Sequence, residues 1–116
     1  MDRRYFSVVF FKTESGNEPV REWLKNLTPN DRKIIGEDIK TVQFSWPLGM
    51  PLIKKIESGL WEVRSRLTNK ISRVIFTVAG DRIFLLHGFI KKSQKLLRED
   101  LDIARQRLND IKRSLK

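Results

Sequence analysis

The first half of the chain shows one short apolar run followed by two stretches with helical spacing. Tyr5 to Phe11 is aromatic and β-branched and stops at a polar turn, which predicts a strand. Apolar residues recur at spacings of three and four from Val20 to Leu27, directly after Pro19, a residue that suits the first turn of a helix. Thr28 and Pro29 predict the start of a second helix, and the prolines and glycine of "SWPLGMP" predict its end.

The second half contains three alternating or apolar segments and one more helical pattern. Leu60 to Leu67 alternates, with Glu62, Arg64 and Arg66 on its polar side, and Lys70 to Val78 alternates as well. A short turn follows, and then Arg82 to Ile90 is apolar on both sides, as expected of a central strand. Spacings of three and four from Leu97 to Leu115 predict an amphipathic terminal helix.

The predicted order of elements is therefore β-α-α-β-β-β-α. It corresponds to an α+β fold with a four-stranded antiparallel or mixed sheet, two N-terminal helices and one C-terminal helix. At 116 residues the chain is expected to be a single domain spanning 1–116.

Composition excludes several classes of site. The chain contains no cysteine and one histidine, which excludes disulfides and argues against a zinc site, so we expect no metal and no cofactor. The apolar run near the N-terminus is too short to span a bilayer, and it lacks a small-residue cleavage site. We therefore expect a cytoplasmic protein without a membrane partner.

The charge is strongly positive. Twenty-four Lys and Arg residues against fourteen Asp and Glu residues give a net charge of +10 and a pI near 10.3. Between Lys54 and Arg98 there are eleven basic and three acidic residues, so this segment holds eight of the ten net charges. A compact domain with such an excess attracts polyanions, and RNA is the leading candidate.

Three arginines are expected on one face of the predicted sheet. Arg64 and Arg66 lie on one strand and Arg73 on the next, and neighbouring strands are about 4.8 Å apart. Guanidinium groups suit phosphate because each is a planar fork of donors that stays charged. A lysine cluster (Lys91, Lys92 and Lys95) follows the last strand and can extend this basic patch.

Each of these features also has a purely structural interpretation. Arg64 and Arg66 fit the solvated side of a half-buried strand, and the lysine cluster fits a device against aggregation. His87 fits a core histidine, because it lies within an apolar strand. Glu62 fits either a general base or a partner that holds an arginine in place, and the three tryptophans fit the core.

The segment from Pro51 to Lys95 resembles the HigB-like, phage-derived branch of the RelE/ParE toxin superfamily. The resemblance rests on "PLIK", "GLWEVR", "SRVIF", "LHGFIKK" and the "LDIARQRLND" of the closing helix. It covers essentially the whole chain and implies a RelE-like fold. It also implies a toxin of a type II toxin–antitoxin system, an endoribonuclease (mRNA interferase) that cleaves mRNA on the ribosome and is silenced by a helix-turn-helix antitoxin.

The resemblance also implies which residues act. By position, the basic residues of the family fall on Arg64, Arg66 and Arg73, with Lys91 or Lys92 at the end of the last strand. Together with the charge pattern this gives the expected catalytic residues Arg64, Arg73, Lys91, Lys92 and His87, and the expected RNA-binding residues Arg66, Lys54, Lys55, Lys70 and Lys95. Several relatives use a tyrosine near the C-terminus, whereas the only tyrosine here is Tyr5. The proton-transfer group therefore stays open between His87, a lysine and the ribosome itself.

The implied partners are mRNA, the ribosome and the cognate antitoxin, with which the chain would form a hetero-oligomer. Two other functions fit the same residues. One is an RNA- or ribosome-binding module without catalysis, and the other is a degenerate toxin that survives as an antitoxin-binding domain.

Overall fold

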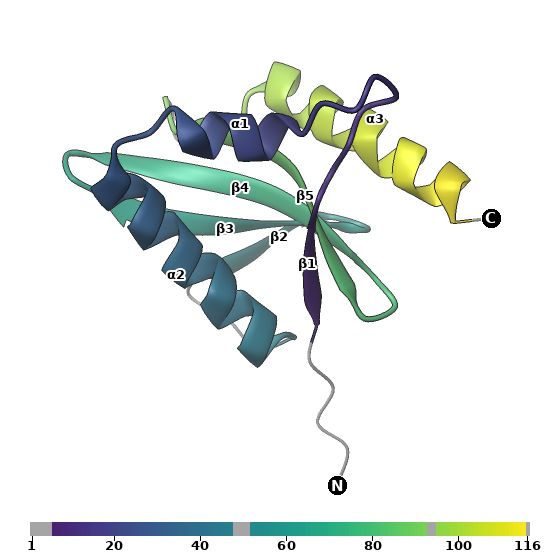
Figure 1. Ribbon diagram of the computed structural model, residues 1–116, viewed down its shortest axis with the longest axis horizontal. Coiled ribbons are helices and arrows are strands. Elements are labelled where there is room, and N and C mark those ends of the chain that lie inside the picture. Colours follow the sequence, from purple (N-terminus) through teal and green to yellow (C-terminus); the bar gives the residue numbers. More distant parts are fainter. Residues whose placement is uncertain (1–5, 48–51, 93–94, 116) are drawn as a thin grey trace, which may run out of the picture.

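The computed structural model describes residues 6–47, 52–92 and 95–115, and in these ranges five strands and three helices follow one another (Figure 1). The elements are β1 (Ser7–Phe10), α1 (Pro19–Lys25), α2 (Pro29–Ser45), β2 (Ile53–Glu57), β3 (Leu60–Leu67), β4 (Lys70–Ala79), β5 (Arg82–Ile90) and α3 (Arg98–Ser114). The predicted α+β class and the order of the predicted elements are confirmed. The sheet has one strand more than the four expected.

All five strands form one mixed sheet in the order β1-β5-β4-β3-β2. β1 runs parallel to β5, with Ser7 opposite Arg82, and the other neighbours are antiparallel. The prediction that Arg82–Ile90 is a central strand is confirmed, because β5 lies between β1 and β4. This position places the C-terminal end of β5 beside β4, so that Phe89 lies opposite Arg73.

The additional strand, β2, pairs with β3 through a tight turn. Its sequence, "IKKIE", breaks the alternation of apolar and polar residues with two adjacent lysines, so its periodicity is weak. The turn provides the better signal, because Ser58-Gly59 separates two β-type runs and Gly59 adopts a φ of 82°. The extra strand brings Lys54 opposite Glu62.

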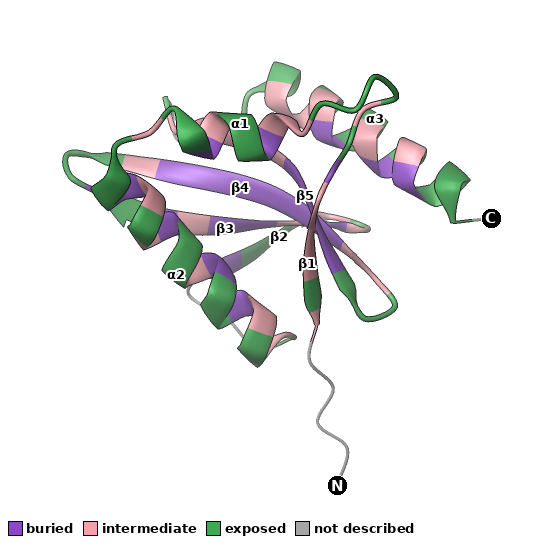
Figure 2. Ribbon diagram, viewed as in Figure 1, coloured by how far each residue is buried: buried purple, intermediate pink, exposed green. Residues whose placement is uncertain are grey.

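Helices cover both faces of the sheet and create two cores. α1 and α2 pack on one face, where Val20, Ile35 and Phe76 are buried, and α3 packs on the other, where Leu86 and Ala104 are fully buried. Figure 2 shows the resulting pattern, with buried residues along the strands and on the inward sides of the helices. The strands are therefore fixed from both sides and can hold side chains at their ends in defined positions.

Local signals set the helix boundaries. The Thr28 hydroxyl accepts a hydrogen bond from the Asp31 backbone N–H at 3.2 Å, so Thr28 is the predicted N-cap, and Pro29 occupies the first turn. α2 ends at Ser45, as predicted, while the later part of "SWPLGMP" and Tyr5 lie outside the described residues. None of the helices in the described ranges has the length and apolar character needed to cross a membrane.

All three tryptophans pack against the core, and one of them also lines a pocket. Trp46 and Trp61 lie 4.9 Å apart, edge to face, and Phe76 lies within 5.5 Å of Trp46. This aromatic cluster packs against the core beneath α1 and α2. Trp23 also packs against this core, but it additionally lines a pocket described below.

Candidate nucleic-acid interface

A buried carboxylate between two guanidinium groups lies on the α3 side of the sheet. Arg64 of β3 is directly opposite Arg73 of β4, and Glu62 lies two residues before Arg64 on the same face. Arg64 Nε donates a hydrogen bond to Glu62 Oε1 at 3.0 Å, and Arg73 Nε lies 3.5 Å from Glu62 Oε2. We call these three residues the Arg–Glu centre.

The members of this centre differ in exposure. The Arg64 side chain is 36% exposed, whereas those of Glu62 and Arg73 are each 3% exposed. The predicted convergence of Arg64 and Arg73 on one face is thus observed. Replacement of Arg73 would leave Glu62 buried with one partner fewer, and breaking a buried pair typically costs about 3–5 kcal/mol.

A pocket of about 290 Å³ opens over Glu62 and Arg73 of the Arg–Glu centre, whereas Arg64 lines a separate pocket of about 520 Å³ together with Arg66. Lys54, Lys55 and Lys95 surround Glu62 and Arg73 in the first of these pockets, which we call the centre pocket. It brings three of the predicted RNA-binding lysines, from β2 and from the segment before α3, to the buried carboxylate and guanidinium.

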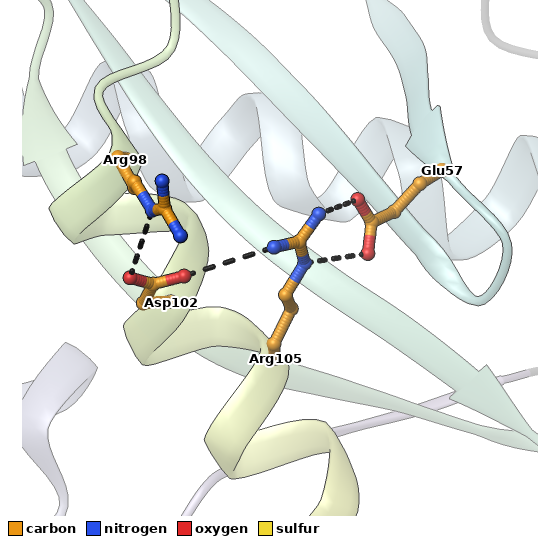
Figure 3. A network of polar contacts seen from close by, with 4 residues as sticks. All are labelled: Glu57, Arg98, Asp102 and Arg105. Atoms are coloured by element: carbon orange, nitrogen blue, oxygen red, sulfur yellow. Dashed lines mark hydrogen bonds and ion pairs between the residues drawn. The ribbon is translucent and has the colours of Figure 1, made fainter.

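Figure 3 shows the contacts that hold α3 near this pocket. Arg105 of α3 donates two hydrogen bonds to Glu57 at the end of β2, at 2.9 and 2.8 Å. Asp102 lies 3.7 Å from Arg105 and 3.8 Å from Arg98. The hydrogen bond from Arg105 lowers the pKa of the Glu57 carboxyl. The network therefore joins the edge strand to the helix that follows Lys95.

A second basic pocket, of about 670 Å³, lies at the tip of the β3–β4 hairpin. We call it the hairpin pocket. Its cationic lining residues are Arg66, Lys70, Lys91 and Lys92. Lys70 also lies 3.4 Å from the buried Asp31 carboxylate. Arg66 shares the face of Arg64, but it contributes to this second pocket and not to the centre pocket.

A third pocket, of about 320 Å³, lies between α1 and the start of α3, and we call it the helix pocket. It shares Arg73 and Lys95 with the centre pocket and Lys91 and Lys92 with the hairpin pocket. The three pockets therefore adjoin one another, and we call the row of cations that lines them the basic track. The predicted basic side chains are distributed along this track and do not all meet at one point.

His87 occupies a different position from the arginines. Its Nε2 is hydrogen-bonded to Asp100 Oδ1 at 2.7 Å, and its ring stacks on that of Phe89 with centroids 5.2 Å apart. The side chain is 15% exposed. His87 is therefore a largely buried residue with a carboxylate partner, at the side of the helix pocket and not in the Arg–Glu centre.

Sequence reasoning did not find the part played by Asp100 and Trp23. Asp100 lies in the first turn of α3, where a carboxylate suits the positive end of a helix, and Trp23 fits the core. No spacing rule connects residue 87 with residue 100, or residue 23 with residue 88, because both contacts depend on how helices dock on the sheet. The one available signal was Gly88, a glycine within a strand, which indicates a close approach of another group.

Within the described residues, no group of three or more His, Cys, Asp and Glu side chains is arranged to hold a metal ion. The exposed polar side chains that line the three pockets are mostly lysines and arginines, which suits an anion with several charges.

Comparison with known proteins gives one assignment. No curated protein matches the chain at a significant level. The model of the family described as phage derived protein Gp49-like (DUF891) matches residues 22–109, which include the second half of α1, all of α2, four of the strands and most of α3. The chain therefore belongs to the phage-derived Gp49-like family, which is related to the RelE and HigB toxins.

Proposed function

We propose that the protein is the toxin of a type II toxin–antitoxin system, in the HigB-like branch of the RelE superfamily, and that it cleaves mRNA on the ribosome. The observation that carries this proposal is the Arg–Glu centre at the base of a lysine-lined pocket within a longer basic track. Family membership and the net charge of +10 support it independently.

The proposed reaction uses the 2′-hydroxyl of the RNA as the nucleophile. The hydroxyl loses its proton, its oxygen attacks the adjacent phosphorus, and the bond to the 5′-oxygen of the next nucleotide breaks as that oxygen gains a proton. Arg64 and Arg73 would stabilise the extra charge on the phosphorane, and one preorganised donor of this kind is typically worth about 3 kcal/mol. Glu62 would hold both guanidinium groups at the required angle.

The lysines of the centre pocket are the proposed proton-transfer groups. Lys54 lies opposite Glu62 on β2, and Lys95 lines the same pocket from the other side. Lys91 and Lys92, which precede Lys95, would bind the flanking phosphates. His87 lies outside this pocket's lining, so in this proposal it acts through its contacts with Asp100 and Phe89.

The reaction is proposed to need no divalent metal ion. Arg64, Arg73, Lys54 and Lys95 already supply the positive charge that a metal would bring to the phosphate, and a cation placed among them would be repelled. The expected products are a 2′,3′-cyclic phosphate, or its opened form, and a 5′-hydroxyl. Products with a 5′-phosphate and a 3′-hydroxyl would contradict this mechanism.

Replacement of Arg64 tests the proposal most directly. Arg64 is half exposed, so Arg64→Ala should leave the fold intact. Induced expression of the unmodified protein should arrest growth and translation, and Arg64→Ala should relieve the arrest and reduce cleavage of ribosome-bound mRNA by a hundredfold or more, as is typical for loss of one such donor, roughly 10²–10³ in rate.

Arg21→Ala is a matched control, because Arg21 is an exposed arginine of α1 with an ordinary surface ion pair to Glu18. It should arrest growth like the unmodified protein. An mRNA with a 2′-deoxy sugar at the cut position should bind but stay intact, since the phosphate contacts remain. Normal growth with soluble, folded protein, or cleavage of the deoxy substrate, would rule the proposal out.

A second candidate function is favoured by the burial of the centre. Because Glu62 already neutralises part of the charge on Arg64 and Arg73, the track could bind RNA or the ribosome without cleaving. Such a binding module, or a degenerate toxin that keeps only antitoxin binding, would bind in a salt-dependent manner yet give no cleavage products at any concentration. Primer extension on translated mRNA separates these functions.

The proposed partner is a co-encoded helix-turn-helix antitoxin in the cytoplasm. An acidic or amphipathic antitoxin surface would be attracted to the basic track, and complementary charge raises the association rate at low salt. Co-expression with the neighbouring gene should restore growth. An association rate that does not change between low and high salt would show that the track is not part of the interface.

A further inference from the structure

The helix pocket has features that the proposed cleavage reaction does not use. β1 pairs with β5 only over Arg82–Leu85, so the last part of β5 lies beyond the end of β1. Gly88, Phe89 and Ile90 from this part of the strand line the pocket. Figure 1 shows α1 and the first turn of α3 near the same end of β5. The pocket thus lies where the sheet edge meets two helices.

Two aromatic side chains line this pocket, Trp23 from the α1 side of the sheet and Phe89 from the α3 side. Trp23 packs so closely over Gly88 that a Cβ atom at position 88 would lie 2.5 Å from Trp23 Cε3, so a side chain there would displace the indole. Phe89 is supported from one side by the His87 ring, at 5.2 Å and nearly parallel, and His87 is held by Asp100. A flat ring could stack in such a site without rearrangement of the protein.

The rim of the pocket carries both signs of charge on different elements. Lys91, Lys92 and Lys95 lie along the track, where phosphates would pass, and Glu99 and Asp100 lie in the first turn of α3. Asp100 is hydrogen-bonded to His87, whereas Glu99 is exposed at the rim. The volume of about 320 Å³ falls at the lower end of the range for small-ligand pockets and exceeds that of one base.

We propose that the helix pocket binds a guanine base of the RNA and thereby sets where the chain is cut. A carboxylate accepts two parallel hydrogen bonds, and on its Watson–Crick edge only guanine presents two adjacent donors, the N1 imino and N2 amino groups. Adenine and cytosine place an acceptor beside their amino group, and uracil places its single imino group between two carbonyls. Glu99 would therefore select guanine, while Phe89, on the same side of the sheet as α3, supplies the stacking surface and Trp23 lines the opposite side of the pocket.

This inference rests on the proposed function, and the shared residues connect the two. Arg73 and Lys95 line both the helix pocket and the centre pocket, so a base in the former would have its phosphate directed along the lysines toward the latter. Cleavage is then expected within one nucleotide of a guanine.

Binding of mononucleotides tests the pocket without any cleavage. The three tryptophan indole N–H groups of the chain give separate two-dimensional NMR signals, and Trp23→Phe identifies that of Trp23. Guanosine 3′-monophosphate should shift the Trp23 signal in a saturable way, and the other three nucleotides should bind more weakly by roughly fivefold or more, as expected for a bidentate pair. No shift, or equal shifts with all four nucleotides, would overturn the proposal.

Two variants give independent readouts. Glu99→Gln should remove the guanine preference while weak binding of all nucleotides continues, because stacking and lysine contacts remain. Gly88→Ala should move the Trp23 signal in the free protein and abolish nucleotide shifts, with circular dichroism to show that the fold persists. Glu37→Gln, at an exposed site on α2, is the control and should behave as the unmodified protein. A retained guanine preference in Glu99→Gln would overturn the assignment.

The cleavage pattern distinguishes failure of the pocket from failure of the proposed function. Primer extension should place the cuts next to guanine, and Glu99→Gln should still cut but spread the cuts over other bases. Guanosine binding without any cleavage would leave the pocket standing and refute the nuclease. Cleavage without base preference, together with no shift of the Trp23 signal, would support the nuclease and refute the guanine pocket.

Discussion

At the scale of single residues, Glu62 is the member of the Arg–Glu centre on which the others depend. It is buried and contacts both Arg64 and Arg73. Its negative charge balances that of the Arg73 guanidinium, which is almost fully shielded from water. Arg73 owes its tolerance of burial to this carboxylate, because charged groups taken out of water need a partner. The centre therefore contributes to stability as well as to the proposed chemistry.

Glu62→Ala should consequently destabilise the protein more than Arg64→Ala. Loss of the carboxylate removes the ion pair between Glu62 and the buried Arg73, which should lower the free energy of unfolding by about 3–5 kcal/mol. Arg64→Ala leaves Glu62 its ion pair with Arg73 but removes a hydrogen bond to a buried carboxylate, and should cost about 1–3 kcal/mol. Urea unfolding followed by circular dichroism measures both. Equal, small effects of the two substitutions would show that the pair contributes nothing to folding.

At the scale of elements, the contact between β2 and α3 includes the ion pair between Glu57 and Arg105, whose strength changes with pH. Arg105 lowers the pKa of Glu57 below its usual value of 4.5. A carboxyl whose pKa is lower in the folded protein stabilises it fully above the unfolded value, and this contribution disappears as the pH falls through the folded value. The edge strand is therefore held to α3 less firmly in acid.

Glu57→Gln should reproduce the acid behaviour at neutral pH. The substitution should lower the urea midpoint at pH 7. The difference from the unmodified protein should begin to shrink below pH 4.5 and vanish once the pH is below the lowered pKa of Glu57, where the carboxyl is protonated and loses its ion pair. Glu37→Gln, on the far helix α2, should show no such pH-dependent difference. A gap between Glu57→Gln and the unmodified protein that widened in acid would contradict the assigned contact.

The elements also show what the sequence can and cannot predict. The limits of β3 and β5 follow from their alternating and apolar patterns, and the hairpin register places Arg64 opposite Arg73. The burial of Arg73 does not follow, because it requires Glu62 and the helix packed above the sheet. β2 was not predicted because its two adjacent lysines interrupt the alternation of apolar and polar residues. The Ser58-Gly59 turn that follows it was the available indication of a strand.

At the scale of the whole molecule, the track connects basic residues that are distant in sequence. Cations from β2, from the β3–β4 hairpin and from the segment before α3 line three neighbouring pockets. A single RNA strand that follows the track would meet several of them in succession. Affinity for RNA should then decline steeply with salt, because each neutralised phosphate releases counterions.

Replacing both Lys91 and Lys92 by Gln should reduce that salt dependence. Each lost phosphate contact should decrease the slope of log affinity against log salt concentration by about 0.7 for a single strand, or about 1.4 for the pair. Fluorescence anisotropy with a deoxy-substituted RNA measures this without cleavage. Lys33 and Lys40, exposed on α2, provide the control pair, and their replacement should leave the slope unchanged. Equal losses in both pairs would indicate nonspecific attraction by net charge.

The position of β5 in the sheet also governs the order in which the protein can assemble during synthesis. β5 is the last strand to be made, yet it lies between β4 and β1, the first strand made. β1 therefore waits without its partner until residues near Arg82 have emerged, and pairings over such separations form slowly. The centre and helix pockets are completed later still, because Lys95 and α3 follow β5. A chain proposed to attack translation thus acquires its complete RNA track only after its own Lys95 and α3 have been translated.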